Sequence, residues 1–337
     1  MKNNIDLNKP TTLKDVAKLA GVSAMTVSNA LNHKGSLSSQ TYEKIMKAVK
    51  ELNYTPNQVA QSLRNSKSNT IGVVMSDASC YVFSEILKGI TAAAAQHNYN
   101  ILLSNTVQDP SVEAKAIDLL LSSRIDGLII VAPLNFSQKD IEHLKSLNIP
   151  FVILMRTSPF TDAEYVVNDN FSGSYQSLRY LYDTGSRDFF FMTIDSSSGY
   201  DRIRGYSHFL SEHGLNFQDF PRDAALPQIQ DGYNSMKKII QQGFHQGAVC
   251  CGCDLMAIGA MNAILEAGFS IPGDFRLIGY DDLEMSQYLR VPLTTVRQPF
   301  YQIGQEGVRV LQNRLMNSDS PMQSVILQPE LIIRQST

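Results

Sequence analysis

The stretch GVSAMTVSNALN (residues 21–32) is too short and too polar to form an ordinary core helix. Four apolar residues in it are nevertheless spaced as one buried face of a helix: Val22, Val27, Ala30 and Leu31. Gly21 ends the apolar stripe that precedes this stretch, and Ser23 can cap the helix that follows. Two short helices around a glycine-centred turn have the dimensions of a helix-turn-helix.

Helices are also expected before and after this turn. Thr12 and Asp15 fit a capping pair at the start of the first helix. Ser38 opens a third helix, which ends at Tyr54-Thr55-Pro56. The apolar residues of this third helix share one face: Ile45, Met46, Val49 and Leu52. The sequence therefore predicts a small all-α bundle at the amino terminus.

Charge is distributed unevenly along the chain. The 337 residues carry a formal charge of −3, and 18% of them are charged. Residues 1–70 hold ten Lys and Arg against four Asp and Glu, a formal charge of +6, so the remaining residues carry −9. A basic amino-terminal segment on an acidic body predicts one part that meets phosphate and one that does not.

From Thr70 onward, apolar strands alternate with helical stretches. Seven strands are expected: TIGVVMS, NILLSN, DGLIIVA, PFVILM, DFFFMTI, GAVCCG and FRLIGY. Helices are expected near residues 84–96, 112–123, 138–147, 200–213, 232–242 and 254–267. Continuous apolar strands with helical crossovers form parallel sheets that are covered on both faces. Two successive runs of this pattern predict two α/β lobes.

The composition favours a cytoplasmic protein that does not enter the membrane. No segment approaches the ~18 uninterrupted apolar residues of a membrane span, and the first ten residues hold no apolar run. We expect the four cysteines to be thiols: Cys80, Cys250, Cys251 and Cys253. Cys250 and Cys253 have C-x-x-C spacing with His245 nearby, but a structural zinc site needs four ligands and no second pair is present. We therefore expect neither a metal nor a cofactor.

A set of motifs occurs in order from about Thr12 to the carboxyl terminus. The motifs are DVAKLAGVSAMTVSNALN, ELNYTPNQVAQSLR, TIGVV, DNF (169–171), Arg202-x-x-Gly205-Tyr206, GCDLMAIGA (252–260), IGYDD (278–282) and LTTVRQP (293–299). This ordered set closely resembles the lac and purine repressor family of bacterial transcription regulators. The resemblance implies a DNA-binding headpiece, a hinge helix that folds on operator DNA, and a core like a periplasmic sugar-binding protein that clamps an effector between two lobes.

The same resemblance implies where the parts begin and end. It places the headpiece at residues 1–57, the hinge helix and linker at 58–70, and the core at 71–337. The chain then crosses between the lobes three times. The implied amino lobe is 71–168 plus 300–326, and the implied carboxyl lobe is 169–299 plus 327–337.

The second helix of a helix-turn-helix enters the major groove of DNA. Four residues on it are predicted to face base edges: Ala24, Met25, Ser28 and Asn29. Asn29 can bond adenine bidentately, whereas Ala24 and Met25 can make only apolar contacts, for example with a thymine methyl. Contacts to phosphate are predicted for Lys14, Ser23, Thr26 and Asn57. The alternative is an ordinary bundle helix whose polar face is solvated.

Residues 57–70, NQVAQSLRNSKSNT, have too few apolar residues to form a core, and so short a helix is mostly unfolded when isolated in water. The resemblance implies that Leu63 is a wedge that enters the minor groove at the operator centre. Two such leucines from a dimer would unstack the central base step and bend the duplex. The alternative is that Leu63 packs on its own headpiece.

A ligand between two α/β lobes sits at the carboxyl ends of the strands. The resemblance assigns direct polar contacts with the effector to Arg202 and Asp281, and an aromatic wall to Tyr81 and Phe83. Charged hydrogen bonds suit a hydroxyl-bearing sugar, but the aromatic faces suit a pyranose and a purine equally. The alternatives are a salt bridge between the lobes for Arg202 and Asp281, and core packing for the two aromatic residues.

Two further effector-binding candidates depart from the family pattern. Met155 stands where many members carry an acid that contacts the ligand, and Cys253 stands where sugar-sensing members often carry Asn. Both changes remove polar contacts that the usual sugar readers make. The effector class therefore stays open between a sugar or sugar derivative and a purine or other non-sugar corepressor.

The resulting prediction is a repressor that binds a near-palindromic operator as a homodimer under the control of a small-molecule effector. An α/β enzyme with a DNA-binding head is the alternative, but the chain contains no G-x-G-x-x-G, G-x-x-x-x-G-K-[ST] or G-x-S-x-G motif. We therefore expect no enzyme. The resemblance places the dimer face along the core, including the apolar stretch ILKGITAAA (residues 86–94).

Overall fold

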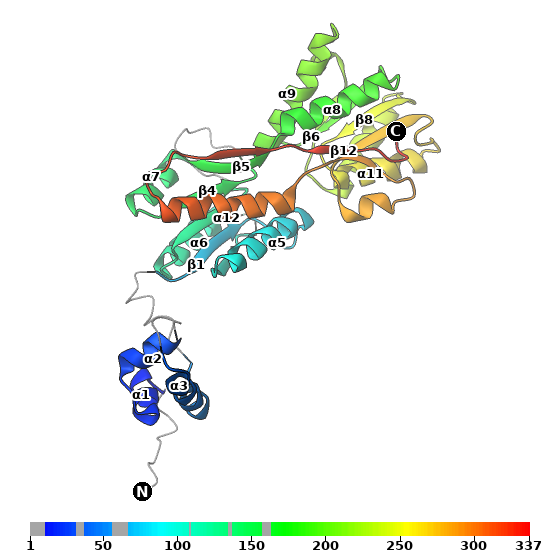
Figure 1. Ribbon diagram of the computed structural model, residues 1–337. Helices are drawn as coiled ribbons and strands as arrows, with labels where there is room; N and C mark the ends of the chain where they lie inside the picture. The colour runs from blue at the N-terminus through cyan, green and yellow to red at the C-terminus, as the bar shows by residue number, and fades with distance from the viewer. Residues whose placement is uncertain (1–10, 32–36, 56–66, 108, 134–136, 157–162) are drawn as a thin grey trace. The chain divides into compact units, whose positions relative to one another are not determined.

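The computed structural model describes residues 11–31, 37–55, 67–107, 109–133, 137–156 and 163–337 (Figure 1). Two compact units make up the chain: Met1–Ser68, here called the head, and Asn69–Thr337, here called the core. None of the helices in the described residues is long and apolar enough to cross a membrane.

The described part of the head contains α1 (Leu13–Ala20), α2 (Ala24–Leu31) and α3 (Ser39–Glu51). Thr12 and Asp15 cap α1 reciprocally, as predicted. Gly21 follows with φ +68°, a left-handed conformation that glycine adopts without steric cost. The Ser23 hydroxyl accepts a hydrogen bond from the Thr26 N–H at 3.1 Å and so caps α2. The predicted helix-turn-helix is confirmed.

A small apolar core holds the three helices together. Its fully buried members are contributed one from each helix: Val16, Val27 and Ile45. Val22 and Leu31 pack against this core with part of their surface exposed. Met46 differs from the prediction, because its side chain is 38% exposed instead of lying on the buried face of α3.

The amino lobe of the core is a parallel sheet with strand order β11-β5-β4-β3-β1-β2. Its strands are β1 (Thr70–Met75), β2 (Asn100–Asn105), β3 (Gly127–Val131), β4 (Phe151–Leu154), β5 (Glu164–Asn168) and β11 (Ser324–Leu327). Its helices are α5 (Tyr81–Gln96), α6 (Pro110–Ser122), α7 (Gln138–Ser146) and α12 (Phe300–Met316).

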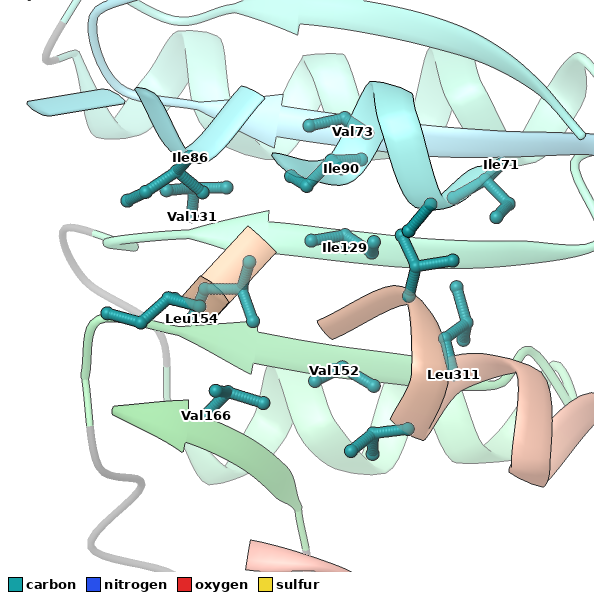
Figure 2. Packing of buried hydrophobic residues seen from close by; sticks show 14 of the residues in the cluster. Ile71, Val73, Ile86, Ile90, Ile129, Val131, Val152, Leu154, Val166 and Leu311 are labelled. Atoms are coloured by element: carbon teal, nitrogen blue, oxygen red, sulfur yellow. The ribbon is translucent and has the colours of Figure 1, made fainter. Parts of the chain in front are cut away.

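Alternate residues of these strands build two separate layers, because successive side chains point to opposite faces of a sheet. Val73, Ile129 and Val152 face one way and pack with Ile86, Ile90 and Leu311 of α5 and α12 (Figure 2). Their neighbours face the other way and pack with α6 and α7: Val74, Ile130 and Ile153. Burial on both faces explains why the strands read as continuous apolar runs.

The carboxyl lobe is a second six-stranded sheet with strand order β12-β10-β9-β8-β6-β7. Its strands are β6 (Phe189–Thr193), β7 (Arg222–Ala224), β8 (Gly247–Cys251), β9 (Phe275–Asp281), β10 (Thr294–Arg297) and β12 (Glu330–Ile332). All pair in parallel except β12, which runs antiparallel to β10. Its helices are α8 (Asn170–Asp183), α9 (Ser197–Glu212), α10 (Ile229–Gln241) and α11 (Asp254–Glu266).

The chain passes between the two sheets at three places (Figure 1). Strand β5 of the amino lobe leads into α8, β10 of the carboxyl lobe leads into α12, and β11 of the amino lobe leads into β12. At the first crossing, the Asp169 side chain accepts a hydrogen bond from the Ser172 N–H at 2.9 Å and caps α8. Each lobe is therefore assembled from segments that are distant in sequence.

Several elements of the core were not predicted: strands β5, β7, β10, β11 and β12, and helices α8 and α12. Strands β7, β11 and β12 lie at sheet edges and lack a buried apolar run. In α8 the first half of the buried face consists of small or polar residues, Gly173, Ser174 and Ser177, and large apolar residues are buried only near its end, at Leu178 and Leu181. Hydrophobic periodicity does not detect a helix of this kind.

The stretch 86–94 lies in α5, and one side of it faces the interior of the amino lobe. Ile86 and Ile90 are fully buried, and Ala94 is 1% exposed. A Cβ on Gly89 would lie 2.0 Å from the Tyr301 carbonyl oxygen, so α5 and α12 pack backbone against backbone. One side of this stretch therefore serves the interior of its own lobe, while Lys88 and Thr91 on the other side are exposed, and the dimer face along this stretch stays a prediction.

Candidate nucleic-acid interface and interlobe cleft

The four residues of α2 that are predicted to face bases differ in how much of their side chain is exposed. Met25 is 69% exposed, and Asn29 is half-buried. Ala24 is also half-buried and packs against the head core. Ser28 is only 5% exposed, because its position on α2 turns its short side chain into the head. Met25 is therefore the most accessible of the four, and the base contact of Ser28 stays a prediction for a side chain with little exposed surface.

Two of the predicted phosphate contacts, Ser23 and Thr26, lie at the amino-terminal end of α2. Ser23 and Thr26 join their hydroxyls at 2.8 Å, with Ser23 exposed and Thr26 half-buried. Lys14 is exposed on α1. The amino-terminal end of a helix carries unpaired N–H groups that favour an anion. Asn57 and Leu63, the remaining predicted DNA contacts, lie outside the described residues.

A cleft of about 1750 Å³ lies between the two lobes of the core. All six predicted effector residues line it: Tyr81, Phe83, Met155, Arg202, Cys253 and Asp281. The first three come from the amino lobe and the last three from the carboxyl lobe. They lie at the carboxyl ends of β1, β4, β6, β8 and β9 or in the first two turns of the helices that follow, where ligands bind in open α/β sheets.

Arg202 is held rigidly in α9 and is 6% exposed. Its Nε donates to Oδ1 of Asn170 at 2.9 Å, and one terminal nitrogen donates to the Gly252 carbonyl. Its guanidinium carbon lies 3.6 Å from the centre of the Tyr280 ring. Arg202 and Asp281 both belong to the carboxyl lobe, so the alternative of a salt bridge between the lobes is wrong for this pair.

Asp281 ends β9 at the crossing between the lobes. Burial raises the pKa of its carboxyl group to about 7, although the positive charge of Arg202 acts to lower it. The Gln298 amide donates to Oδ1 of Asp281 at 2.6 Å. A partly protonated carboxyl in such a place can both accept and donate a hydrogen bond to a ligand.

Three residues that line the cleft have a left-handed backbone that non-glycine residues rarely adopt. They follow or end central strands: Ala132 (φ +49°), Met155 (φ +67°) and Asp281 (φ +119°). Such conformations cost free energy and persist only where the surrounding structure imposes them. The edge of the cleft is therefore shaped by the packed sheets beneath it.

Sequence reasoning missed several residues that build the site. Gln298 also lines the cleft, and its Oε1 is buried without a hydrogen-bond partner among the described residues. Oδ1 of Asn168, at the first crossing, is also buried without a hydrogen-bond partner among the described residues. Asp254 is fully buried and accepts hydrogen bonds from Leu283 N–H, Ser286 and Thr295, which holds the loop after β9. The motifs DNF, GCDL and VRQP adjoin Asn168, contain Asp254 and contain Gln298, respectively, and could have indicated these residues.

The cysteines are enclosed in apolar surroundings. Cys250 and Cys251 lie in β8 and are 0% and 1% exposed, as expected for a buried strand. Burial raises the pKa of the Cys253 thiol to about 12. His245 stacks on Phe269 with ring centres 5.4 Å apart. In the described parts of the chain, no three His, Cys, Asp or Glu side chains gather in a way that could hold a metal ion.

Comparison with known proteins matches both units. Residues 12–57 match the model of bacterial regulatory proteins of the lacI family, and residues 178–337 match a periplasmic binding protein-like domain. The transcriptional repressor PurR of Histophilus somni is 31% identical over 328 residues, which cover 96% of this chain and 98% of PurR. This chain belongs to the lacI family. It is a DNA-binding transcriptional repressor of that family, whose members are regulators and not enzymes.

Two further relatives show the range within the lacI family. The ribose operon repressor of Haemophilus influenzae is 30% identical, and the match covers 96% of this chain and 98% of that protein. The crystal structure of the lac repressor dimer bound to operator and an anti-inducer superposes with a TM-score of 0.88 at 29% identity, covering 97% and 99% of the two chains. The expected family and fold class are confirmed.

Proposed function

We propose that this lacI-family protein is a cytoplasmic homodimeric repressor whose affinity for a near-palindromic operator is set by a small molecule in the interlobe cleft. The main support is that Arg202, Asp281 and Gln298 line a cleft between two lobes and are held in place by hydrogen bonds. We assign DNA binding to residues 1–57, the hinge to 58–70, and effector binding and dimerisation to 71–337. The lobes divide as 71–168 plus 300–326 and 169–299 plus 327–337.

Operator reading is assigned to the exposed side of α2. Asn29 supplies the hydrogen-bonded contact to a base, and Met25 and Ala24 supply apolar contact. Lys14, Ser23, Thr26 and Asn57 hold phosphates and set orientation, and Leu63 enters the minor groove. Two heads of a symmetric dimer bind half-sites about one DNA turn apart.

The effector we propose first is a sugar or sugar derivative. Arg202 offers charged donors, Asp281 offers an acceptor, and the unpartnered Oε1 of Gln298 is suited to a hydroxyl donor. Tyr81 and Phe83 line the opposite lobe and suit the apolar face of a ring. Cys253 and Met155 add a non-polar surface to the same cleft. The ribose operon repressor among the relatives supports this class.

A purine or other non-sugar corepressor is the second candidate. The specific observation in its favour is that Met155 and Cys253 give the cleft fewer polar side chains than the usual sugar readers have. A flat heterocycle needs an apolar slot with polar groups at its edge. Relatives named PurR agree with this reading.

The proposed dimer face is the edge of the amino-lobe sheet at β2. Leu102 and Leu103 on this strand are each 40% exposed, and Leu119 on the adjoining helix α6 is 64% exposed. An edge strand with exposed leucines is a surface that a symmetric partner can cover. The exposed side of residues 86–94 in α5, which adjoins β2, is kept as part of the same proposed face.

Regulation follows from the three crossings between the lobes. An effector that contacts Arg202 in one lobe and Phe83 in the other has a different affinity for different interlobe angles. A change of angle moves the point near Thr70 from which each hinge leaves its core, so hinge packing on DNA changes with it. Coupling of this kind is typically about 1–3 kcal/mol, or about 5- to 150-fold in operator affinity.

A mobility-shift titration with a random-sequence operator pool, in the presence and absence of a sugar and nucleobase panel, tests the proposal. We expect selection of a near-palindrome and a shift in its affinity with one class of compound. Sequence-independent binding, or operator affinity that no compound changes, would overturn it. Because the effector sites are separate from the head, Arg202→Ala should keep DNA binding and lose the response.

A further inference from the structure

The cleft extends well beyond the residues that surround Arg202. Its volume of about 1750 Å³ exceeds the ~300–1,000 Å³ that small-molecule sites usually occupy. The additional space is lined from the carboxyl lobe by β7, by the loop that contains Leu226 and Pro227, and by one side of α10. None of these residues takes part in the contacts of Arg202, Asp281 or Gln298 described above.

Helix α10 has two chemically distinct faces. Its inner face packs on α11: Met236 is fully buried, and a Cβ on Gly232 would lie 2.1 Å from the Met256 carbonyl oxygen. Four polar residues follow one another at steps of three or four positions, which places them on one face of a helix. We call them the α10 stripe: Asp231, Asn234, Lys238 and Gln241. All four line the cleft.

The stripe rests on a fixed support. Lys238 Nζ lies 3.3 Å from Oδ2 of Asp223 on β7, and the Ser235 hydroxyl donates to the same oxygen at 2.5 Å. Gln230 donates to Oδ1 of Asn234 at 3.1 Å and so orients the Asn234 amide. Among the described residues, no acceptor is found for the N–H groups of that amide. Beside the stripe, Leu226 is 62% exposed and lines the same cleft.

We propose that the α10 stripe is a second subsite for a hydroxyl-rich unit, and that the effector is a disaccharide or longer glycoside. Carboxylate, ammonium and two carboxamides together offer donors and acceptors, which is the combination that sugar hydroxyls require. Leu226 supplies apolar surface for the face of a second ring. This inference rests on the proposed sugar effector, whose first ring occupies the inner part of the cleft at Arg202.

The first experiment measures binding to full-length protein by calorimetry with matched sets of sugars. The probes are glucose with cellobiose and maltose, galactose with lactose and melibiose, and xylose with xylobiose. We expect at least one disaccharide to bind about tenfold more tightly than either of its monosaccharides, since two added hydrogen bonds give a factor of that order. A monosaccharide that binds as tightly as every disaccharide containing it overturns the second subsite and leaves the proposed sugar effector standing. If no sugar binds, both proposals fail.

The second experiment separates the subsite from the inner site. Asn234→Ala and Gln241→Ala should each weaken the disaccharide about fivefold and leave monosaccharide binding unchanged. Gln242→Ala is the matched control, because Gln242 is exposed beside Gln241 and does not line the cleft. Both test residues are exposed, so the variants should melt at the wild-type temperature. Equal loss for both ligands, or no loss for the disaccharide, contradicts the assignment.

Discussion

The guanidinium carbon of Arg202 lies 3.6 Å from the centre of the Tyr280 ring, and both side chains are buried. The Tyr280 hydroxyl in turn accepts a hydrogen bond from the Asn168 amide at 3.2 Å, at the first crossing between the lobes. Asp281, which follows Tyr280 in β9, lines the cleft. Arg202, the residue that we assign to effector binding, is therefore stacked on a side chain of β9, the strand that also carries Asp281. The same tyrosine links Arg202 to the first crossing between the lobes.

Arg202→Lys should weaken effector binding about tenfold or more. Lysine keeps the charge but loses the planar fork that bonds Asn170 and the Gly252 carbonyl, and it stacks less well on Tyr280. Calorimetric titration with the effector measures the loss. Arg204→Lys is the matched control, because Arg204 is exposed on the same helix. Wild-type affinity in Arg202→Lys would contradict the assigned role.

Asp281→Asn should flatten the dependence of core stability on pH. The folded-state pKa is about 7 against an ordinary value of 3.8, so the folded state binds more protons than the unfolded state between these values. Stability must then fall as pH rises from about 4 to about 7. Urea unfolding across this range measures the slope, to which buried Asp254, with a pKa of about 6, also contributes. Asp77→Asn is the control, because the pKa of the Asp77 carboxyl is lowered and its removal should not flatten the slope. An unchanged slope in Asp281→Asn refutes the prediction.

Met25→Ala should change the preference at one or two operator base pairs and leave the salt dependence nearly intact. Met25 is 69% exposed and can contact a base but carries no charge. Lys14→Gln should do the opposite and reduce the salt slope by about 1 without changing preference. Both are measured by titrating operator variants at several salt concentrations. A change of salt slope in Met25→Ala would show that the division between base and phosphate contacts is wrong.

Leu63→Ala should weaken operator binding far more than nonspecific DNA binding, and effector binding should persist. The wedge that it removes acts only where the central base step is opened, and opening that step costs a few kcal/mol. Salt-matched titrations with operator and random DNA compare the two losses. Equal losses on both DNAs would count against the wedge.

Leu103→Lys should convert the dimer to a monomer. A charge on the exposed side of β2 cannot be covered by a symmetric partner without loss of its hydration. Light scattering measures the molar mass. Met316→Lys is the control, because Met316 is 75% exposed at the end of α12, a helix that packs on β3, β4 and β5. A variant that stays dimeric, or a wild-type mass near four subunits, would place the interface elsewhere.

Local patterns in the sequence were sufficient for the elements that carry their own signal. The capping pair of Thr12 and Asp15, the turn at Gly21, and the central strands β1, β3, β4, β6, β8 and β9 were all predicted and are present. Each depends on neighbours a few residues away, or on burial of both faces of a strand, which leaves a continuous apolar run. The edge strands β7, β11 and β12, and the first half of α8 with its small buried residues, lack such a signal.

Other features depend on which segments meet, and only the tertiary structure decided them. Residues 86–94 are an apolar stretch in sequence, but only the structure shows that Ile86 and Ile90 face inward and that α12, more than two hundred positions later, packs against Gly89. The low exposure of Ser28, 5%, likewise depends on how the helices of the head pack. Arg202 comes from α9, Asp281 from β9, and Gln298 from the crossing between β10 and α12, and their contacts depend on how these elements pack. Burial and long-range contact are properties of the assembled chain, whereas caps, turns and strand periodicity are properties of adjacent residues.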